Sequence, residues 1–412
     1  MSQNPPRYRW YILALSTATG TFVAAIPFSC LPVLFRDISN DLNLSLVQIG
    51  TIWGLSSLAG IFVSLIAGLL SDRFKVKLVL GICSILVGLT GAMRGLSTSF
   101  LMLSIIVFAN GIFRSVIPIN TTRTIGLWFR GRGLGLASGV GAMGMGLGLM
   151  AGPLISETVL VPLLGGWRNV LFFYGVLSAA MGILWLLFGK ELPRSDTEER
   201  RTKMPPFRET LRSLVPSKAL WLIGLILLFR MGCINGMTGY LPLYLRGIGW
   251  SPASADSTLA VFYAVSSLSV VPLSALSDRM GARKPILYAG LVAGMVSIGL
   301  LPVIGGGSVW LFMVLSGIFM DAFMAVTTTL LLETEGVGAA RSGAALGLVF
   351  TISQTGGVVS PPLGNSFAGT DSRLPFFFWA ALSIGAIITL FFTKETGWRK
   401  KRAAASNLTA AG

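Results

Sequence analysis

Long, uninterrupted runs of apolar residues dominate the chain. A helix needs about 20 apolar residues to cross a bilayer, and twelve runs reach that length. They do not alternate in segments of about 10 residues, as the strands of a membrane barrel do. The pattern therefore predicts twelve membrane-spanning helices, at residues 10–36, 46–70, 76–96, 100–122, 131–156, 166–189, 219–245, 254–276, 284–304, 308–332, 342–366 and 374–393.

Composition supports an integral, all-α membrane protein. Hydrophobic residues make up 53% of the 412 residues, charged residues 12%, and mean hydropathy is +0.76. A soluble domain carries roughly 25% charged residues, so this chain has too little charge to cover a water-facing surface. The first run, 10–36, exceeds the apolar core of about 7–15 residues in a signal peptide, and we expect it to stay as the first helix.

The residue types needed for common catalytic centres are missing. The chain has no histidine, which excludes imidazole metal ligands and Ser-His or Cys-His nucleophile pairs. Cys30, Cys83 and Cys233 all fall within predicted spans and are expected to be small buried residues. We therefore expect no enzyme, no cofactor and no metal site.

The net charge of +16 predicts how the spans are oriented. Cytoplasmic loops collect Lys and Arg. Placing both termini in the cytoplasm puts 25 of the 32 basic residues there, and the charge then needs no nucleic-acid partner. We expect a monomer in the inner membrane, with the lipid bilayer as its surroundings. The other face receives Arg36, Arg94, Arg168, Arg246 and Arg373.

The chain repeats itself at a spacing of 206–210 residues. Ser71-Asp72-Arg73 recurs as Ser277-Asp278-Arg279, and Gly139, Gly148 and Pro153 recur as Gly347, Gly356 and Pro361. Six spans per repeat predict two parallel halves with a site between them. The predicted parts are a first half at 1–189, a cytoplasmic linker at 190–218 with a short surface helix near 207–214, a second half at 219–396 and a tail at 397–412.

The loop motif after the second span resembles that of the major facilitator superfamily, and the resemblance covers essentially the full chain. The family pattern Gly-x-x-x-Asp-Arg-x-Gly-Arg-Lys is matched by Gly68, Asp72 and Arg73, although Lys75 and Val76 depart from it. The copy after the eighth span fits better, with Asp278, Arg279, Gly281, Arg283 and Lys284. The resemblance implies a transporter of two six-helix bundles, in which both loops gate the cytoplasmic side.

Two further motifs point to branches of that family. The fifth span resembles the motif Gly-x8-Gly-x3-Gly-Pro of proton-linked drug exporters and anion carriers, with Gly139, Gly148, Gly152 and Pro153. The stretch Trp128-Phe129-x-x-Arg132-Gly133, with Gly166-Trp167-Arg168, resembles the organic-anion branches, which include oxalate/formate-type and cyanate-type carriers. The arginine pair that nitrate carriers use in the second and eighth spans is absent, and the subfamily stays open.

Three charged residues lie in mid-span, where insertion costs about 2.5–3.5 kcal/mol each. These are Arg114, Arg230 and Asp321, in spans 4, 7 and 10, which line the central cavity in this family. We expect Arg114 and Arg230 to bind a small carboxylate from opposite halves, since guanidinium grips carboxylates bidentately. Asp321 would carry the coupling proton. The alternative is a structural ion pair between Asp321 and an arginine.

Further cavity candidates are polar or aromatic residues of the same helices. Asn110 is one turn from Arg114 and shares its face, and interhelical hydrogen bonding is the alternative role for such amides. The expected function is proton-coupled uptake or exchange of a small organic anion, and the alternative is efflux of a hydrophobic compound. The remaining candidates are Asn235, Tyr240, Tyr263, Gln354 and Trp53.

Overall fold

The computed structural model describes residues 7–73, 75–129, 133–190, 214–304 and 306–397, with the backbone alone at 64–73 and 338–340. Within these residues, twelve helices are long and apolar enough to cross a membrane, which confirms the twelve predicted spans. The first half contains α1 (Tyr8–Thr19), η1 (Gly20–Ala25), α2 (Ile26–Ser29), α3 (Leu31–Leu42), α4 (Leu46–Arg73), α5 (Val76–Arg94), α6 (Phe100–Trp128), α7 (Leu134–Ile155), η2 (Ser156–Leu160), α8 (Val161–Leu164) and α9 (Trp167–Phe188).

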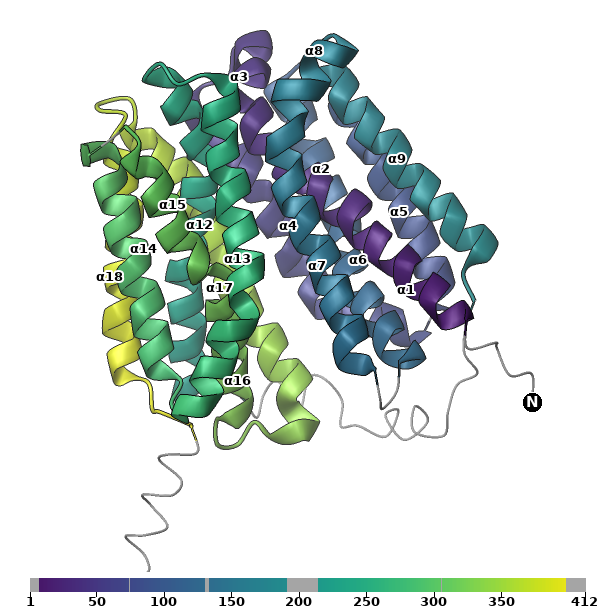
Figure 1. Cartoon of the computed structure of the whole chain (residues 1–412), viewed down its shortest axis with the longest axis vertical. Helices are drawn as coiled ribbons and strands as arrows, with labels where there is room; N and C mark the ends of the chain where they lie inside the picture. Colours follow the sequence, from purple (N-terminus) through teal and green to yellow (C-terminus); the bar gives the residue numbers. More distant parts are fainter. Residues whose placement is uncertain (1–6, 74, 130–132, 191–213, 305, 398–412) are drawn as a thin grey trace, which may run out of the picture.

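The second half repeats this plan with fewer interruptions. Its elements are α12 (Lys218–Gly247), α13 (Pro252–Met280), α14 (Lys284–Ile304), α15 (Ser308–Ile318), α16 (Met320–Glu333), α17 (Gly338–Phe367) and α18 (Leu374–Phe392). Figure 1 shows the two halves as separate bundles that stand side by side.

Three spans are interrupted along their length. The first span turns through the π-helical segment η1 and then meets Pro27, which has no N–H to donate. The fifth span passes through η2, and the tenth breaks at Phe319, between α15 and α16. Such breaks free backbone groups and change the direction of a helix.

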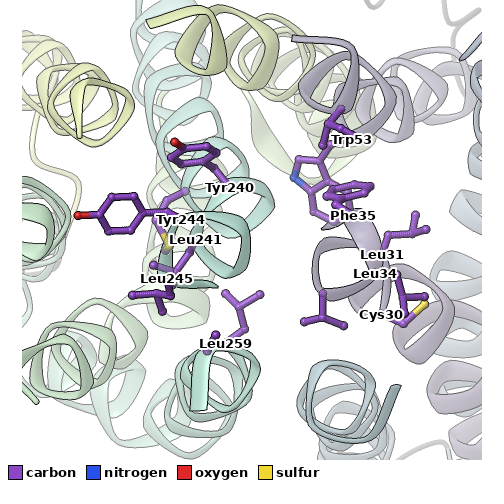
Figure 2. Close-up of a cluster of buried hydrophobic side chains, with 14 of the residues drawn as sticks. Cys30, Leu31, Leu34, Phe35, Trp53, Tyr240, Leu241, Tyr244, Leu245 and Leu259 are labelled. Atoms are coloured by element: carbon purple, nitrogen blue, oxygen red, sulfur yellow. The ribbon is translucent and has the colours of Figure 1, made fainter. Parts of the chain in front are cut away.

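The halves share one apolar core at the face where α3 and α8 lie, which we call the closed face. There a single cluster of buried side chains includes Leu34 and Trp53 from the first half and Leu241 and Leu259 from the second. Figure 2 shows part of this cluster, with residues contributed by both halves. The other large clusters each belong to one half, around Leu80 or around Leu291.

The opposite face, where α1 begins and α18 ends, is the open face. The space around individual glycines shows how closely the halves approach each other at the two faces, because a Cβ atom added to a glycine either meets a neighbour or does not. Near the closed face, a Cβ on Gly146 of α7 would collide with Ser267, and one on Gly357 of α17 with Ser57, both across the boundary between halves. Toward the open face, Gly139 of α7 and Gly347 of α17 have no neighbour within 4 Å. The halves therefore meet at the closed face and part toward the open face.

Most of the predicted linker lies outside the described residues, and so do the predicted surface helix and nearly all of the tail. The division into domains at these boundaries stays a prediction.

Candidate functional site

Arg114 of α6 contacts the first span of its own half, close to the boundary between the halves. Its Cζ lies 4.3 Å from the ring centroid of Phe28 in α2, and the side chain is partly exposed. Phe28 stacks on Trp53 of α4 at 4.7 Å, and the indole nitrogen of Trp53 donates to the backbone oxygen of Asn235 at 2.8 Å. A cation over an aromatic face is stabilised there without a counter-ion.

A cavity of about 310 Å³ begins one helical turn from Arg114. Pro118 lines it and lies four residues after Arg114, so both occupy the same face of α6. Hydroxyl groups of four residues on three helices also line it, and that of Ser16 has no hydrogen-bond partner among the described residues. The cavity offers several hydroxyl groups to a small solute, and Arg114 lies one helical turn beyond its lining. These hydroxyl residues are Ser16, Thr121, Thr122 and Ser138.

Arg94 is a further cation inside the first half, and its burial was not predicted from the sequence. We had placed it on an outer surface because it ends a span, but it is only 1% exposed. Its Nη1 donates to the backbone oxygen of Pro27 at 3.3 Å, and its Nη2 has no hydrogen-bond partner among the residues that the structure describes. Pro27 and Phe28 are consecutive, so Arg94 and Arg114 both reach the same short stretch of α2.

Arg230 of α12 lies inside the second bundle. It is 4% exposed, its Nη1 lies beside Gly294 of α14, and its Cζ is 5.3 Å from the ring of Phe323 in α16. Neither Nη atom has a hydrogen-bond partner in the described part of the chain. The structure therefore places this guanidinium away from the boundary where we expected it to face Arg114. The physical reason is room: Gly294 has no side chain, and the aromatic face attracts the cation.

Counter-charges distinguish these arginines from others. Arg168 pairs with Asp41 at 3.0 Å, and Arg283 with Asp278 and Glu333 at 2.5 and 2.8 Å. Among the described residues, no carboxylate forms an ion pair with Arg94, Arg114 or Arg230. A guanidinium left unpaired in a membrane core is a functional candidate by default.

Asp321 is the second residue of α16, two residues after the break at Phe319. The hydroxyl of Ser266 in α13 donates to its Oδ2 at 2.6 Å, and the backbone N–H of Asp321 donates back to Ser266 at 3.1 Å. The first turn of a helix favours a carboxylate. No ion pair joins Asp321 to an arginine in the described ranges, so the structural ion pair that we considered is not seen.

Comparison with known proteins decides the family. The model of the Major Facilitator Superfamily matches residues 17–361, with a second match at 248–410. The chain belongs to the Major Facilitator Superfamily. It is therefore a multi-pass membrane protein of a transporter family.

Relatives in this superfamily are named for anions. Over 428 residues the chain is 27% identical to a "Probable nitrate/nitrite antiporter NarK1" of Thermus thermophilus, covering 96% of this chain and 92% of that protein. It is 24% identical to a "Probable sulfoacetate transporter SauU" of Cupriavidus necator, covering 90% of each.

A solved structure supports the fold. A bacterial homologue of the lysosomal transporter Spinster, inward-facing and unoccupied, superposes with a TM-score of 0.73 at 17% identity, covering 95% of this chain and 97% of that one. This likeness confirms the major facilitator fold of two six-helix bundles.

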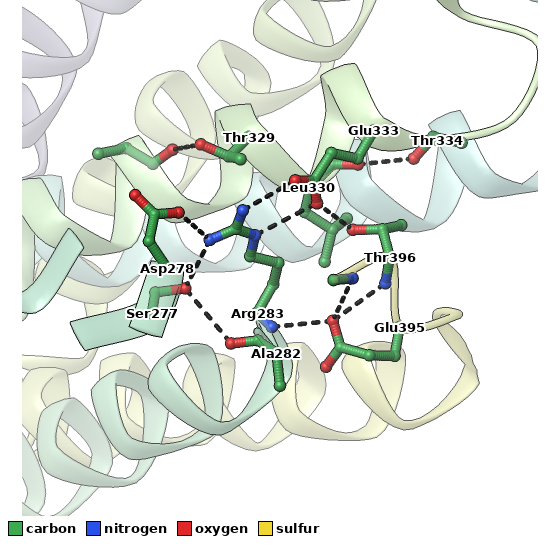
Figure 3. A network of polar contacts seen from close by, with 12 residues as sticks. Ser277, Asp278, Ala282, Arg283, Thr329, Leu330, Glu333, Thr334, Glu395 and Thr396 are labelled. Carbon is green, nitrogen blue, oxygen red and sulfur yellow. Dashed lines mark hydrogen bonds and ion pairs between the residues drawn. The ribbon is translucent and has the colours of Figure 1, made fainter. Parts of the chain in front are cut away.

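The second loop motif of this Major Facilitator chain builds a polar network at the open face (Figure 3). Buried Arg283 bridges Asp278 at the end of α13 and Glu333 at the end of α16, whereas Arg279 is exposed. Glu395, after α18, accepts from the backbone N–H of Arg283 at 2.8 Å and of Lys284 at 3.0 Å. Burial acts to raise the pKa of Glu395, but four backbone N–H donors outweigh it and hold the pKa below its ordinary value. The network ties three chain segments together.

The first copy of the motif cannot be compared in the same way. Gly68, Asp72 and Arg73 belong to α4, but their side chains lie outside the described residues. Their gating role stays a prediction.

The predicted amide residues lie in contacts between helices. Asn110 donates to the Val87 oxygen at 3.0 Å and to Thr90 at 2.9 Å, which ties α6 to α5. Asn235 donates to Ser57 at 3.0 Å, across the boundary between halves. These contacts give both amides the structural role that we had named as their alternative.

Gln354 of α17 lies at the same boundary and is partly exposed. Its side chain packs on Gly60 of α4, where a Cβ would collide with the amide. It is therefore placed where either half could move against it.

The predicted tyrosines are buried. Tyr240 packs against Phe376 and Trp379, and its hydroxyl donates to the Ser372 oxygen at 3.2 Å. Tyr263 is 3% exposed and lies one turn before Ser266, the partner of Asp321. Tyr240 thus packs at the closed face within the second half, and Tyr263 lies near the acid.

Proposed function

We propose that this chain is a secondary active transporter that moves a small organic anion, such as a carboxylate, by alternating access. The observation that carries the proposal is the pair Arg94 and Arg114, two membrane-embedded guanidiniums beside Pro27 and Phe28 with no carboxylate partner in the described chain. An anion that enters the adjoining cavity supplies the missing counter-charge. The anion-named relatives support this reading.

Asp321 is the proposed coupling group. It is a partly exposed carboxylate held by Ser266, and it lies at a helix break where a small movement changes its surroundings. Protonation of Asp321 linked to substrate movement would give symport or exchange. Arg230 keeps its proposed role in binding, which requires its guanidinium to leave the contact with Phe323 during the cycle.

We also propose that the open face is cytoplasmic, which places both termini in the cytoplasm of a cell with this protein in its inner membrane. The basic residues near that face support the orientation. In this arrangement the structure is the inward-open state of the transporter.

Thermal-shift titration of purified protein tests the cargo. We expect carboxylates or sulfonates to stabilise the wild-type protein, and Arg114→Gln to weaken this binding by about 100-fold or more, because a bidentate charged contact is lost. The unliganded Arg114→Gln protein should unfold at the wild-type temperature. The matched control Arg373→Gln, an exposed arginine, should bind as the wild-type protein does.

Unchanged affinity in Arg114→Gln removes that residue from the site. Stabilisation by hydrophobic drug-like compounds alone, insensitive to Arg114→Gln, favours the alternative of efflux.

A further inference from the structure

One arginine and two carboxylates form a buried cluster that joins the halves at the closed face. Arg246, at the end of α12, donates through Nη2 to Asp256 Oδ2 of α13 at 2.5 Å and through Nη1 to Glu157 Oε1 of η2 at 3.3 Å. The side chains are 1%, 0% and 10% exposed, respectively. Glu157 belongs to the first half and the other two residues to the second. We call these three residues the Arg246 latch.

The charges of the latch do not balance. One guanidinium faces two carboxylates, and Glu157 Oε2 and Asp256 Oδ1 have no hydrogen-bond partner in the described chain. The charged neighbours on α3, Arg36 and Asp37, add one positive and one negative charge, so the excess of one negative charge remains. A buried carboxylate without compensation takes up a proton in preference to keeping its charge.

We propose that the Arg246 latch is a proton-binding site. The closed face forms with one proton held by Glu157 or Asp256, and that proton returns to the medium at the same face when the halves separate. The proton does not cross the membrane by this route. The latch therefore makes the conformational equilibrium depend on the pH at this face, and acid favours closure.

The repeat supplies an internal comparison. Asn365 lies 208 residues after Glu157, the same offset that relates Pro153 to Pro361. Its Nδ2 donates to the Leu46 oxygen at 2.8 Å, which is also a contact between halves. At equivalent positions of the repeat, the neutral amide of Asn365 and the carboxylate of Glu157 each make a contact with the other half. Closure by itself needs no carboxylate, and the acid at position 157 adds the response to pH.

Distance measurement between spin labels at the closed face tests the proposal. Because no substrate is needed, the result does not depend on whether the proposed anion is correct. The labels are placed on exposed Asn40→Cys and Thr370→Cys, one in each half, after the three buried native cysteines are replaced by alanine. In detergent, we expect the short, closed distance to dominate at pH 5.5 and a longer distance to grow toward pH 8.5. A single proton changes the ratio of the two populations by up to about tenfold per pH unit.

Isosteric variants assign the proton. Glu157→Gln removes the excess charge and should stay closed at both pH values, and Asp256→Asn provides the same test if Glu157→Gln fails to fold. The control Asp371→Asn, an exposed acid of the same face, should keep the wild-type response. A wild-type distance that does not change with pH, or a Glu157→Gln protein that responds as fully as the wild type, overturns the proposal.

Discussion

The buried arginines of this protein differ in what compensates their charge. Arg246 has two carboxylate partners. Arg230 has an aromatic ring and a glycine for neighbours, and neither of its Nη atoms donates a hydrogen bond in the described chain. Burying an ion without a partner costs several kcal/mol. Evolution keeps such a residue where function requires it, which is why Arg230 stays a candidate although it faces the interior of one bundle.

Replacing Arg230 separates stability from function. We expect Arg230→Met to raise the stability of the protein by about 1–4 kcal/mol, because an apolar side chain removes an uncompensated charge, and to lose anion transport. Thermal unfolding in detergent and uptake into proteoliposomes measure the two effects.

The contrasting variant is Arg246→Met. It leaves two buried carboxylates unpaired and should destabilise the protein by about 3–5 kcal/mol. A loss of stability in Arg230→Met of similar size would show that Arg230 is a structural cation.

At the residue scale, the sequence predicted which charged residues are costly to bury, but not which residues their side chains contact. Arg114 and Arg230 were identified because a charge within an apolar run is expensive. The direction of Arg230 depends on Gly294, 64 residues away in the chain, and no local pattern contains that information. Arg94 was missed for a related reason: at the end of a span, the same residue type is equally compatible with an exposed position.

At the element scale, apolar length predicted the spans, and several glycines of the fifth span lie at close contacts between helices. A Cβ on Gly148 would lie 2.6 Å from that of Ala25, which agrees with tight contact between α7 and the first span. The breaks at η1, η2 and Phe319 were not predicted. A break depends on tertiary contacts that outweigh local helix preference, and these contacts cannot be read from the local sequence.

The contact between α4 and α17 is also made through glycine. A Cβ on Gly54 would lie 2.6 Å from the backbone oxygen of Val358. We expect Gly54→Ala to destabilise this conformation by about 1–3 kcal/mol, since a rigid backbone must move to admit the methyl group. Thermal unfolding measures the loss.

Gly139→Ala is the matched control, because Gly139 has no neighbour within 4 Å. It should leave stability unchanged or raise it by up to about 1 kcal/mol through better helix propensity. Equal effects of the two substitutions would contradict the close approach of α4 and α17.

At the scale of the whole molecule, the repeat offsets predicted two halves, and the structure has two bundles. Which face is closed could not be predicted, because both conformations of a transporter have one sequence and differ by only a few kcal/mol. Contacts between side chains far apart in the chain, such as those of Trp53 with Asn235, decide it.

Cysteine labelling in intact cells tests the proposed orientation. We expect a membrane-impermeant maleimide to modify Asn40→Cys at the closed face directly, and Lys75→Cys at the open face only after the membrane is permeabilised. Both positions are exposed. The wild-type protein is the control, since Cys30, Cys83 and Cys233 are buried. The reverse order of labelling would place the termini outside the cell.

The glycines of α4 have a consequence for how the two bundles move. Gly50, Gly54 and Gly60 follow one another along the helix, and each one meets α17, at Pro361, Val358 and Gln354 respectively. Two of these three encounters are with main-chain atoms, so little in the line of contact has rotamers to exchange. Such a contact allows one bundle to rotate against the other while the distance between α4 and α17 stays constant. The helix ends far from this contact then move furthest.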